Sequence, residues 1–203
     1  MTSAPAASVA SPREQVPIFG TEENRAQLMA IHDEALRHWP VPFETSFVTT
    51  RYGRTHVIAS GDPSSPPLVM THPAAVGAFV WSSIIAPLSE RRRVYALDTI
   101  GDFGRSELAD PDRYPKNGRD YSAWLDDVYE QLDLTQADVV AGSMGGWIAM
   151  NHAIYAPDRL RRLVLLGPMG LPPWRATLAV LIPFVWYVMR PTEARLDRIS
   201  SGP

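Results

Sequence analysis

The segment at residues 140–146, VAGSMGG, holds the residue types and spacing best suited to chemistry. An apolar run meets an expected helix here, and Ser143 stands at the corner between Gly142 and Gly145. Such a turn is crowded, so the residues that flank the serine must be small. It lifts the serine oxygen clear of a sheet and aims the N–H groups of the following helix at the same point. The segment predicts a nucleophilic serine; the alternative is a helix-capping serine beside structural glycines.

The elements around this corner alternate between short apolar runs and longer amphipathic ones. Strands that are apolar throughout and alternate with helices form parallel sheets, so the chain is expected to be an α/β protein with right-handed crossovers. The expected strands are 67–72, 93–98, 137–142 and 160–167, and the expected helices are 79–91, 120–132 and 145–156.

Two further elements are expected ahead of this alternation. Residues 45–52 and 54–60 are β-rich and meet at Gly53, which predicts an N-terminal antiparallel hairpin. Residues 21–39 have helical spacing, with Thr21 as the cap and Pro40 after the end. The mostly parallel sheet therefore begins with an antiparallel pair.

Composition excludes several classes of protein. The 203 residues carry a net charge of −3, are 45% hydrophobic and include no cysteine. Disulfides, thiolate metal sites and a cysteine nucleophile are excluded, and a cytoplasmic location is expected. Nucleic acid is not an expected partner, since the one basic cluster, Arg91–Arg93, is small and is interpreted as a solvated loop. His32 and His38 lie on opposite sides of their expected helix, so no metal site is expected.

Four more segments, together with the serine corner, resemble the α/β-hydrolase fold family in the family's own order. Within it the resemblance is to bacterial carboxylesterase-type members, over roughly residues 45–170. The segments are HPAA at 72–75 with Trp81 beyond it, DTIGDFGRS at 98–106, YSAWLDDV at 121–128 and APDRL at 156–160.

The resemblance implies roles for individual residues. Ser143 would be the nucleophile, and the backbone N–H of Met144 would form one arm of an oxyanion hole. The other arm would be the N–H of Ala74, because Pro73 has none to donate. A serine at position 143 argues against the dehalogenase and epoxide-hydrolase branches.

The remaining residues singled out near the site have structural roles in this interpretation. His72 would hold the loop that carries Ala74, and Asp98 would accept N–H bonds within its own turn. Gly142 and Gly145 would make room for the corner. The resemblance implies neither a cofactor nor a metal.

A general base for Ser143 is not evident in the sequence. His152 is the one histidine after the serine, and nine helical residues carry it about 13.5 Å along and to the opposite face. A base must come within about 3 Å of the hydroxyl. No acid follows the strand at 160–167 either, where the sequence is GPM.

The chain is therefore expected to be the N-terminal two-thirds of a serine hydrolase, truncated at the start of its lid. Base and acid would come from sequence not present here or from another chain. The expected parts are a disordered tail at 1–18, an incomplete hydrolase core at 19–170 and the start of a lid at 171–203.

The expected activity is hydrolysis of a small-molecule carboxylic ester through an acyl-serine intermediate. Acyl transfer, carbon–carbon bond hydrolysis and an inactive fragment or binding module remain as alternatives. Residues 160–167 would leave an open apolar sheet edge through which the chain could self-associate. Within residues 171–190, the fourteen-residue apolar run between Arg175 and Arg190 is too short to span a membrane and is interrupted by Pro183, so a packed or interfacial helix pair is expected. The aromatic residues that could line a pocket or pack are Trp81, Trp174, Phe184 and Trp186.

Overall fold

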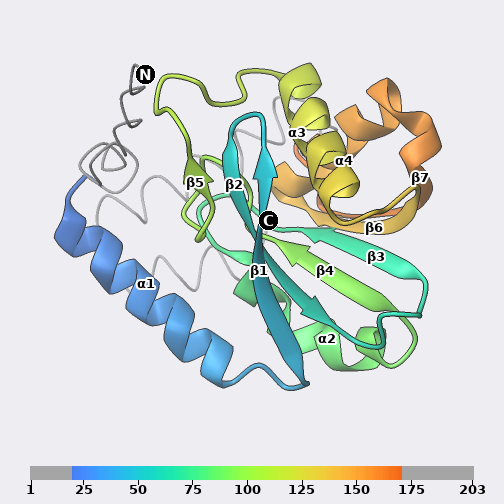
Figure 1. Ribbon diagram of the computed structural model, residues 1–203, viewed down its shortest axis with the longest axis horizontal. Helices are drawn as coiled ribbons and strands as arrows, with labels where there is room; N and C mark the ends of the chain where they lie inside the picture. Colours follow the sequence, from blue (N-terminus) through green and yellow to red (C-terminus); the bar gives the residue numbers. More distant parts are fainter. Residues whose placement is uncertain (1–19, 171–203) are drawn as a thin grey trace, which may run out of the picture. The chain divides into compact units, whose positions relative to one another are not determined.

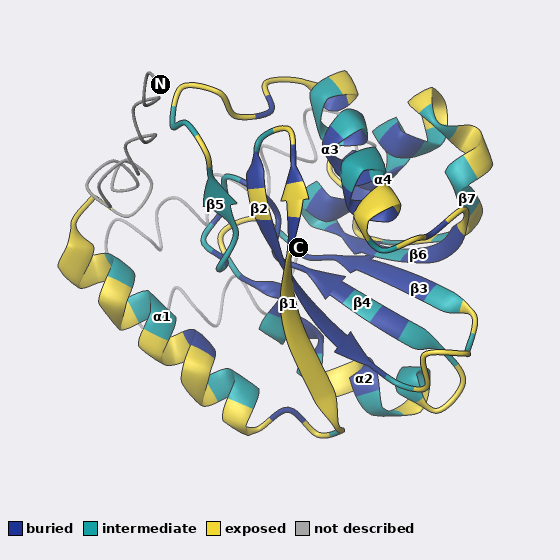
Figure 2. Cartoon of the chain, viewed as in Figure 1, coloured by how far each residue is buried: buried dark blue, intermediate teal, exposed yellow. Residues whose placement is uncertain are grey.

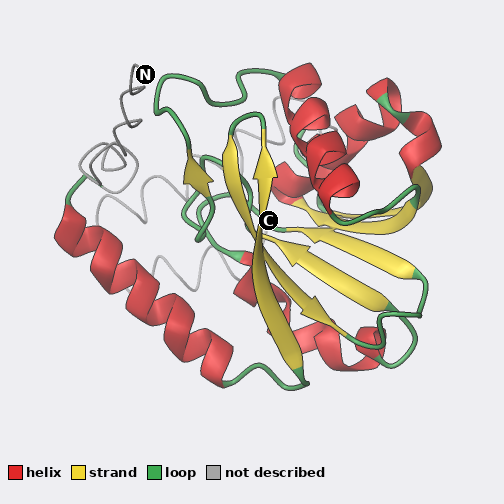
Figure 3. Ribbon diagram, in the orientation of Figure 1, coloured by secondary structure: helices red, strands yellow, loops and turns green. Residues whose placement is uncertain are grey.

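The strands form one sheet in the order β1-β2-β4-β3-β6-β7, with a short strand β5 paired to β2 (Figure 1). The computed structural model describes residues 20–170. Helices α3 and α4 lie together beside one part of the sheet, and α2 lies by another (Figure 3). The elements are α1 (Glu22–Arg37), β1 (Phe43–Thr50), β2 (Gly53–Ser60), β3 (Pro67–Thr71), α2 (Ser82–Ser89), β4 (Arg93–Leu97), β5 (Glu107–Leu108), α3 (Gly118–Gln131), β6 (Ala137–Gly142), α4 (Ser143–Tyr155) and β7 (Leu160–Leu166).

The predicted mixture of strand directions is confirmed. β1 pairs with β2 and β2 with β4 in antiparallel fashion, while β3 pairs with β4 and β6, and β6 with β7, all in parallel. The two-residue strand β5 was not expected, because its pairing with Gly53 and Arg54 depends on where the chain returns after β4.

Successive residues of the central strands pack on opposite faces of the sheet. Val69 of β3 belongs to a core with Trp124 and Ile148 of α3 and α4. Leu68 and Met70 belong to a second core, on the α2 side. Figure 2 shows the central strands almost wholly buried. The continuous apolar runs in the sequence arise because both faces are covered.

Helix α1 forms where expected, but the residue that it buries is a histidine rather than an apolar residue. The Thr21 hydroxyl accepts the Asn24 N–H at 3.1 Å and caps the helix. Ile31, an apolar residue, is 57% exposed. His32 is the buried residue of the helix, with its ring edge-on to Phe79 at 4.7 Å between centroids.

The expectation of a solvated Arg91–Arg93 loop is wrong for two of its residues. Arg93 is the first residue of β4, and its side chain is only 12% exposed and paired with Glu44. Arg92 pairs with Asp138 at 3.2 Å. Sheet pairing draws these side chains against carboxylates that are distant in sequence.

Strand β7 lies at one end of the sheet and pairs only with β6 among residues 20–170. Val164 and Leu166 are 50% and 48% exposed, so the edge is apolar, as its sequence indicated. Self-association through this edge remains a prediction.

Contacts divide the chain into two compact units, residues 1–168 and 169–203. The sheet belongs to the first unit. The predictions for the 1–18 tail, the 171–203 lid and the aromatic residues Trp174, Phe184 and Trp186 lie outside the described residues. No described helix is long and apolar enough to cross a membrane.

Candidate active site at the carboxyl end of the sheet

Ser143 stands where β6 passes directly into α4. β6 ends at Gly142 and α4 begins at Ser143, with no loop between them. The backbone of Ser143 is left-handed, with φ of +48°. Few residues other than glycine adopt this conformation, and those that do concentrate at functional sites.

The glycines beyond the serine permit a close approach of backbones. A Cβ on Gly145 would lie 2.6 Å from the Thr71 carbonyl carbon and 2.7 Å from the His72 oxygen. A Cβ on Gly142 would meet side-chain atoms of Pro73 at 3.3 Å and of Trp81 at 3.5 Å. The need for a small residue is therefore much stronger at position 145 than at position 142.

Hydrogen bonds tie the first turn of α4 to the end of β3. The Gly145 N–H donates to the His72 carbonyl at 3.2 Å. The Thr71 hydroxyl donates to the Gly145 carbonyl at 3.2 Å. The serine corner is thus braced by the strand whose next residues form the 72–78 loop.

His72 is fully buried and joins two loops. Its Nε2 accepts the Thr99 N–H at 2.9 Å, which leaves Nδ1 to donate to the Pro73 carbonyl at 2.7 Å. This tautomer follows from the two partners. Both ring nitrogens are engaged in holding the loop after β3 against the turn after β4.

A second contact between these loops runs through Asp102. Its carboxylate accepts the Ala75 N–H at 3.1 Å and the Phe103 N–H at 2.8 Å. Ala75 has a left-handed backbone, with φ of +63°. Sequence reasoning did not single out Asp102, because its partner belongs to a different loop.

Asp98 makes a third and more extensive connection. Only 1% exposed, it accepts the Ala78 N–H at 2.7 Å, the Arg105 N–H at 2.9 Å and the His56 Nδ1–H at 2.8 Å. Burial alone would raise its pKa, but the His56 hydrogen bond and charge, with the two amides, lower the pKa to about 2. The expected bond within its own turn is present, and two partners from other elements are added to it.

His56 on β2 was not expected near the site. It lies there because the Asp98 N–H donates to the His56 carbonyl at 3.0 Å, extending the β2–β4 pairing by one residue. His32 also borders this cluster, with its ring against Gly77. Burial lowers the pKa of His32.

Two backbone amides are the candidates to donate to a group that reacts at Ser143. The first N–H groups of a helix have no acceptor inside it, and Met144 is the second residue of α4. In the described part of the chain, the bonds that hold the 72–78 loop engage the amides of Ala75 and Ala78 but not that of Ala74. Backbone donors of this kind can stabilise a negative oxygen.

All five histidines of the chain lie in the described region, and each has contacts away from Ser143. His38 contacts Glu34, and His152 lies between α3 and α4 with its Nδ1 3.3 Å from the Ser122 hydroxyl. His152 is fully buried, and burial lowers its pKa. Residues 20–170 also contain no cluster of three or more potential metal ligands.

The strand-to-helix serine, the loop after β3 and the sheet order define a class of protein. Residues 66–190 match the α/β-hydrolase fold family, and the chain belongs to that family.

Among its relatives is the uncharacterized carboxylesterase nap of Bacillus subtilis, 35% identical over 146 residues, which are 72% of this chain and 48% of the relative. Carboxylesterase YbfK of the same organism is 33% identical over 150 residues, 74% of this chain and 50% of the relative. The crystal structure of naproxen esterase (carboxylesterase NP) from Bacillus subtilis superposes with a TM-score of 0.74 at 28% identity, covering 88% of this chain and 60% of that one. The chain thus spans about half the length of the curated relatives it matches.

Proposed function

We propose that the protein is a serine hydrolase that cleaves small-molecule carboxylic esters through an acyl-Ser143 intermediate. The observation that carries the proposal is the left-handed Ser143 at the start of α4, followed directly by Met144 in the first turn of the helix. The similarity to two bacterial carboxylesterases supports an ester as the substrate. The net charge of −3 gives no support to a nucleic-acid substrate.

In the proposed reaction, the Ser143 oxygen attacks the ester carbonyl carbon while its proton passes to a general base. The carbonyl oxygen becomes negative and accepts hydrogen bonds from Met144 and Ala74. Collapse expels the alcohol, which takes the proton, and water then releases the acid by the same route.

The base in this proposal is not one of the chain's own histidines. His72 uses both ring nitrogens to hold its loop, and His56 is bound to Asp98. His152 faces α3 rather than the serine corner. We therefore expect the serine in this 203-residue chain to be positioned and to lack a base.

Hydrolysis of p-nitrophenyl acetate with and without added imidazole tests both parts of the proposal. Imidazole is a diffusible base, so it should raise the rate of the wild-type chain above that of Ser143→Ala measured at the same imidazole concentration. Subtracting the Ser143→Ala rate removes the direct reaction of imidazole with the ester.

The other outcomes are equally informative. A Ser143-dependent rate without imidazole would support the serine but contradict the missing base. No Ser143-dependent rate under either condition would contradict the proposed function and favour an inactive binding module.

A further inference from the structure

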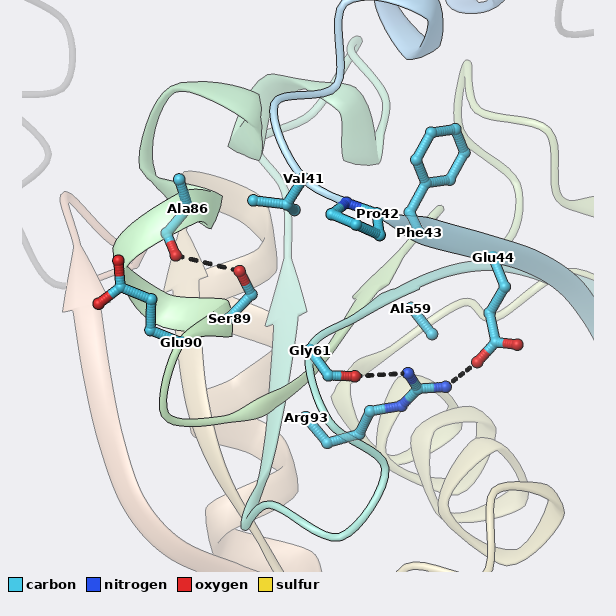
Figure 4. A pocket seen from close by; sticks show the side chains of 10 residues that line it. All are labelled: Val41, Pro42, Phe43, Glu44, Ala59, Gly61, Ala86, Ser89, Glu90 and Arg93. Carbon is cyan, nitrogen blue, oxygen red and sulfur yellow. Dashed lines mark hydrogen bonds and ion pairs between the residues drawn. The ribbon is translucent and has the colours of Figure 1, made fainter.

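A cavity of about 590 Å³ lies at the end of the sheet opposite Ser143. It is bordered by Arg93 at the start of β4, whereas the serine corner lies beyond the carboxyl ends of the parallel strands. Figure 4 shows its walls, which come from the chain before β1, from β1 and β2 and from α2. The volume is within the range of about 300–1,000 Å³ typical of small-molecule sites.

Most of the wall is apolar and Arg93 supplies a fixed cation. Val41, Pro42, Ala59 and Ala86 give an aliphatic surface. The guanidinium of Arg93 is always charged. Its Nη1 donates to the Gly61 carbonyl at 2.9 Å, and its Cζ lies 5.5 Å from the centre of the Tyr95 ring. These two contacts hold the guanidinium in place.

One edge of this guanidinium is incompletely satisfied. Nη2 contacts a single oxygen of Glu44, and Nε is buried with no acceptor. Arg51 and Arg161, in contrast, each bind both oxygens of an aspartate through Nε and Nη2, at 2.7–2.9 Å. An unsatisfied buried donor is costly, and a second carboxylate oxygen would satisfy it.

The present partner of Arg93 can be displaced. The Glu44 side chain is 64% exposed, so it can turn into solvent at little cost, whereas the Arg93 side chain is 12% exposed. A ligand carboxylate that used both Nε and Nη2 would make a better pair than the single contact of Glu44.

We propose that this cavity binds a monocarboxylate with a short aliphatic chain, which displaces Glu44 from the Nε–Nη2 edge of Arg93. The chain packs on the aliphatic wall while the carboxylate takes the place of the Glu44 oxygen. This class includes acids of the kind that ester hydrolysis releases, which connects the site to the proposed function. Binding at Arg93 does not require that function.

Two-dimensional ¹H–¹⁵N NMR of the whole chain at pH 7, titrated with sodium hexanoate, tests the proposal. A ligand of this size should bind with a Kd of about 1 mM. The amide signals of Ala59 and Gly61 and the Nε–H signal of Arg93 should move, whereas 1-hexanol and hexylamine should move them far less.

Two glutamate variants distinguish displacement of Glu44 from a general effect of charge on hexanoate affinity. Glu44→Gln removes the competitor and should tighten hexanoate binding at least about threefold. Glu90→Gln removes an equal charge from the same cavity without touching Arg93, and should change the affinity less. Arg93→Lys keeps the charge but loses the two-donor edge, so it should weaken binding.

Several results would overturn the inference. These are equal binding of hexanol and hexanoate, equal effects of Glu44→Gln and Glu90→Gln, no shift at all, or shifts confined to Gly145 and Gly146. Should Arg93→Lys fail to fold, the comparison of the two glutamate variants decides alone. Because the readout is at Arg93, failure here and failure of Ser143-dependent hydrolysis are distinguishable.

Discussion

The charged residues at the two ends of strand β4 differ in the kind of partner that they have. Beyond its carboxyl end, Asp98 is buried and receives three hydrogen bonds from different elements. At its amino end, Arg93 is paired with a carboxylate that is mostly in solvent. At the carboxyl end the charge binds N–H groups from separate elements, whereas at the amino end the partner of Arg93 is free to turn into solvent.

Backbone conformation follows the same division. Ser143 and Ala75, two of the three described non-glycine residues with positive φ, lie at the carboxyl end. The third, Asp133, follows the end of α3, where left-handed residues are common. The carboxyl end thus contains two residues in a sparsely populated backbone conformation, which is typical of functional sites.

The largest expected effect is at Asp98. Asp98→Asn should lower the free energy of unfolding by about 3–5 kcal/mol, because an amide nitrogen would face donors and His56 would lose its buried partner. Urea denaturation followed by circular dichroism measures this. Asp62→Asn, at an exposed turn, is the control and should leave the midpoint close to wild type. Similar midpoints for both variants would contradict the contrast between the two ends.

Gly145→Ala is expected to have the next largest effect. It should lower the free energy of unfolding by about 2–3 kcal/mol, because the added Cβ would press on the backbone of Thr71 and His72. Gly167→Ala is a matched control, since that glycine has φ of +53° but nothing within 4 Å of an added Cβ. Gly145→Ala should shift the urea midpoint more than Gly167→Ala. The reverse order would show that strain in φ outweighs the contact with β3.

Acid should weaken the fold in two stages. Burial lowers the pKa of both His32 and His152, so the unfolded chain takes up protons more readily. The free energy of unfolding that depends on these two neutral histidines is at its full value above pH 6.5 and falls as the pH drops below it. The contribution of Asp98 is complete above pH 3.8 and is lost as the pH falls towards about 2.

Urea midpoints measured between pH 8 and pH 5 test the first stage. His152→Gln should flatten the decline, and replacement of the exposed His38 is the control. A wild-type midpoint that rises on acidification would contradict the assignment of both buried histidines as neutral.

A smaller difference is expected at Ser143 itself. Ser143→Gly should be more stable than Ser143→Ala by about 1 kcal/mol, since only glycine adopts a φ of +48° without steric cost. Differential scanning calorimetry of the two variants gives the comparison. Equal melting temperatures would mean that the corner is unstrained.

The smallest stability effect is expected at the amino end. Glu44→Gln should change the free energy of unfolding by less than about 1 kcal/mol, because the Glu44 carboxylate is mostly exposed to solvent. A loss comparable to that of Asp98→Asn would show that Glu44 is an integral partner and would weaken the case for its displacement. Chemical denaturation of both variants under one set of conditions makes the comparison direct.

Local signals were sufficient to predict four of the strands and the serine corner. Apolar runs marked β3, β4, β6 and β7, and small residues around Ser143 marked the corner. The pairing of His56 with Asp98 depends on the register of β2 against β4, which no short stretch of sequence contains. The pairing of Arg93 with Glu44, 49 residues earlier, likewise depends on how distant strands are placed in the sheet. Contacts that are set by register between distant strands are the part that sequence patterns could not supply.

The bond between Thr71 and the first turn of α4 also bears on the order of folding. The two partners are 74 residues apart, and closing a loop of that length costs entropy that only completed β3–β6 pairing offsets. An isolated 137–155 segment can form strand or helix locally but has nothing to hold Ser143 in a left-handed conformation. The left-handed geometry of Ser143 therefore forms late in folding, and compact intermediates without β3–β6 pairing would lack it.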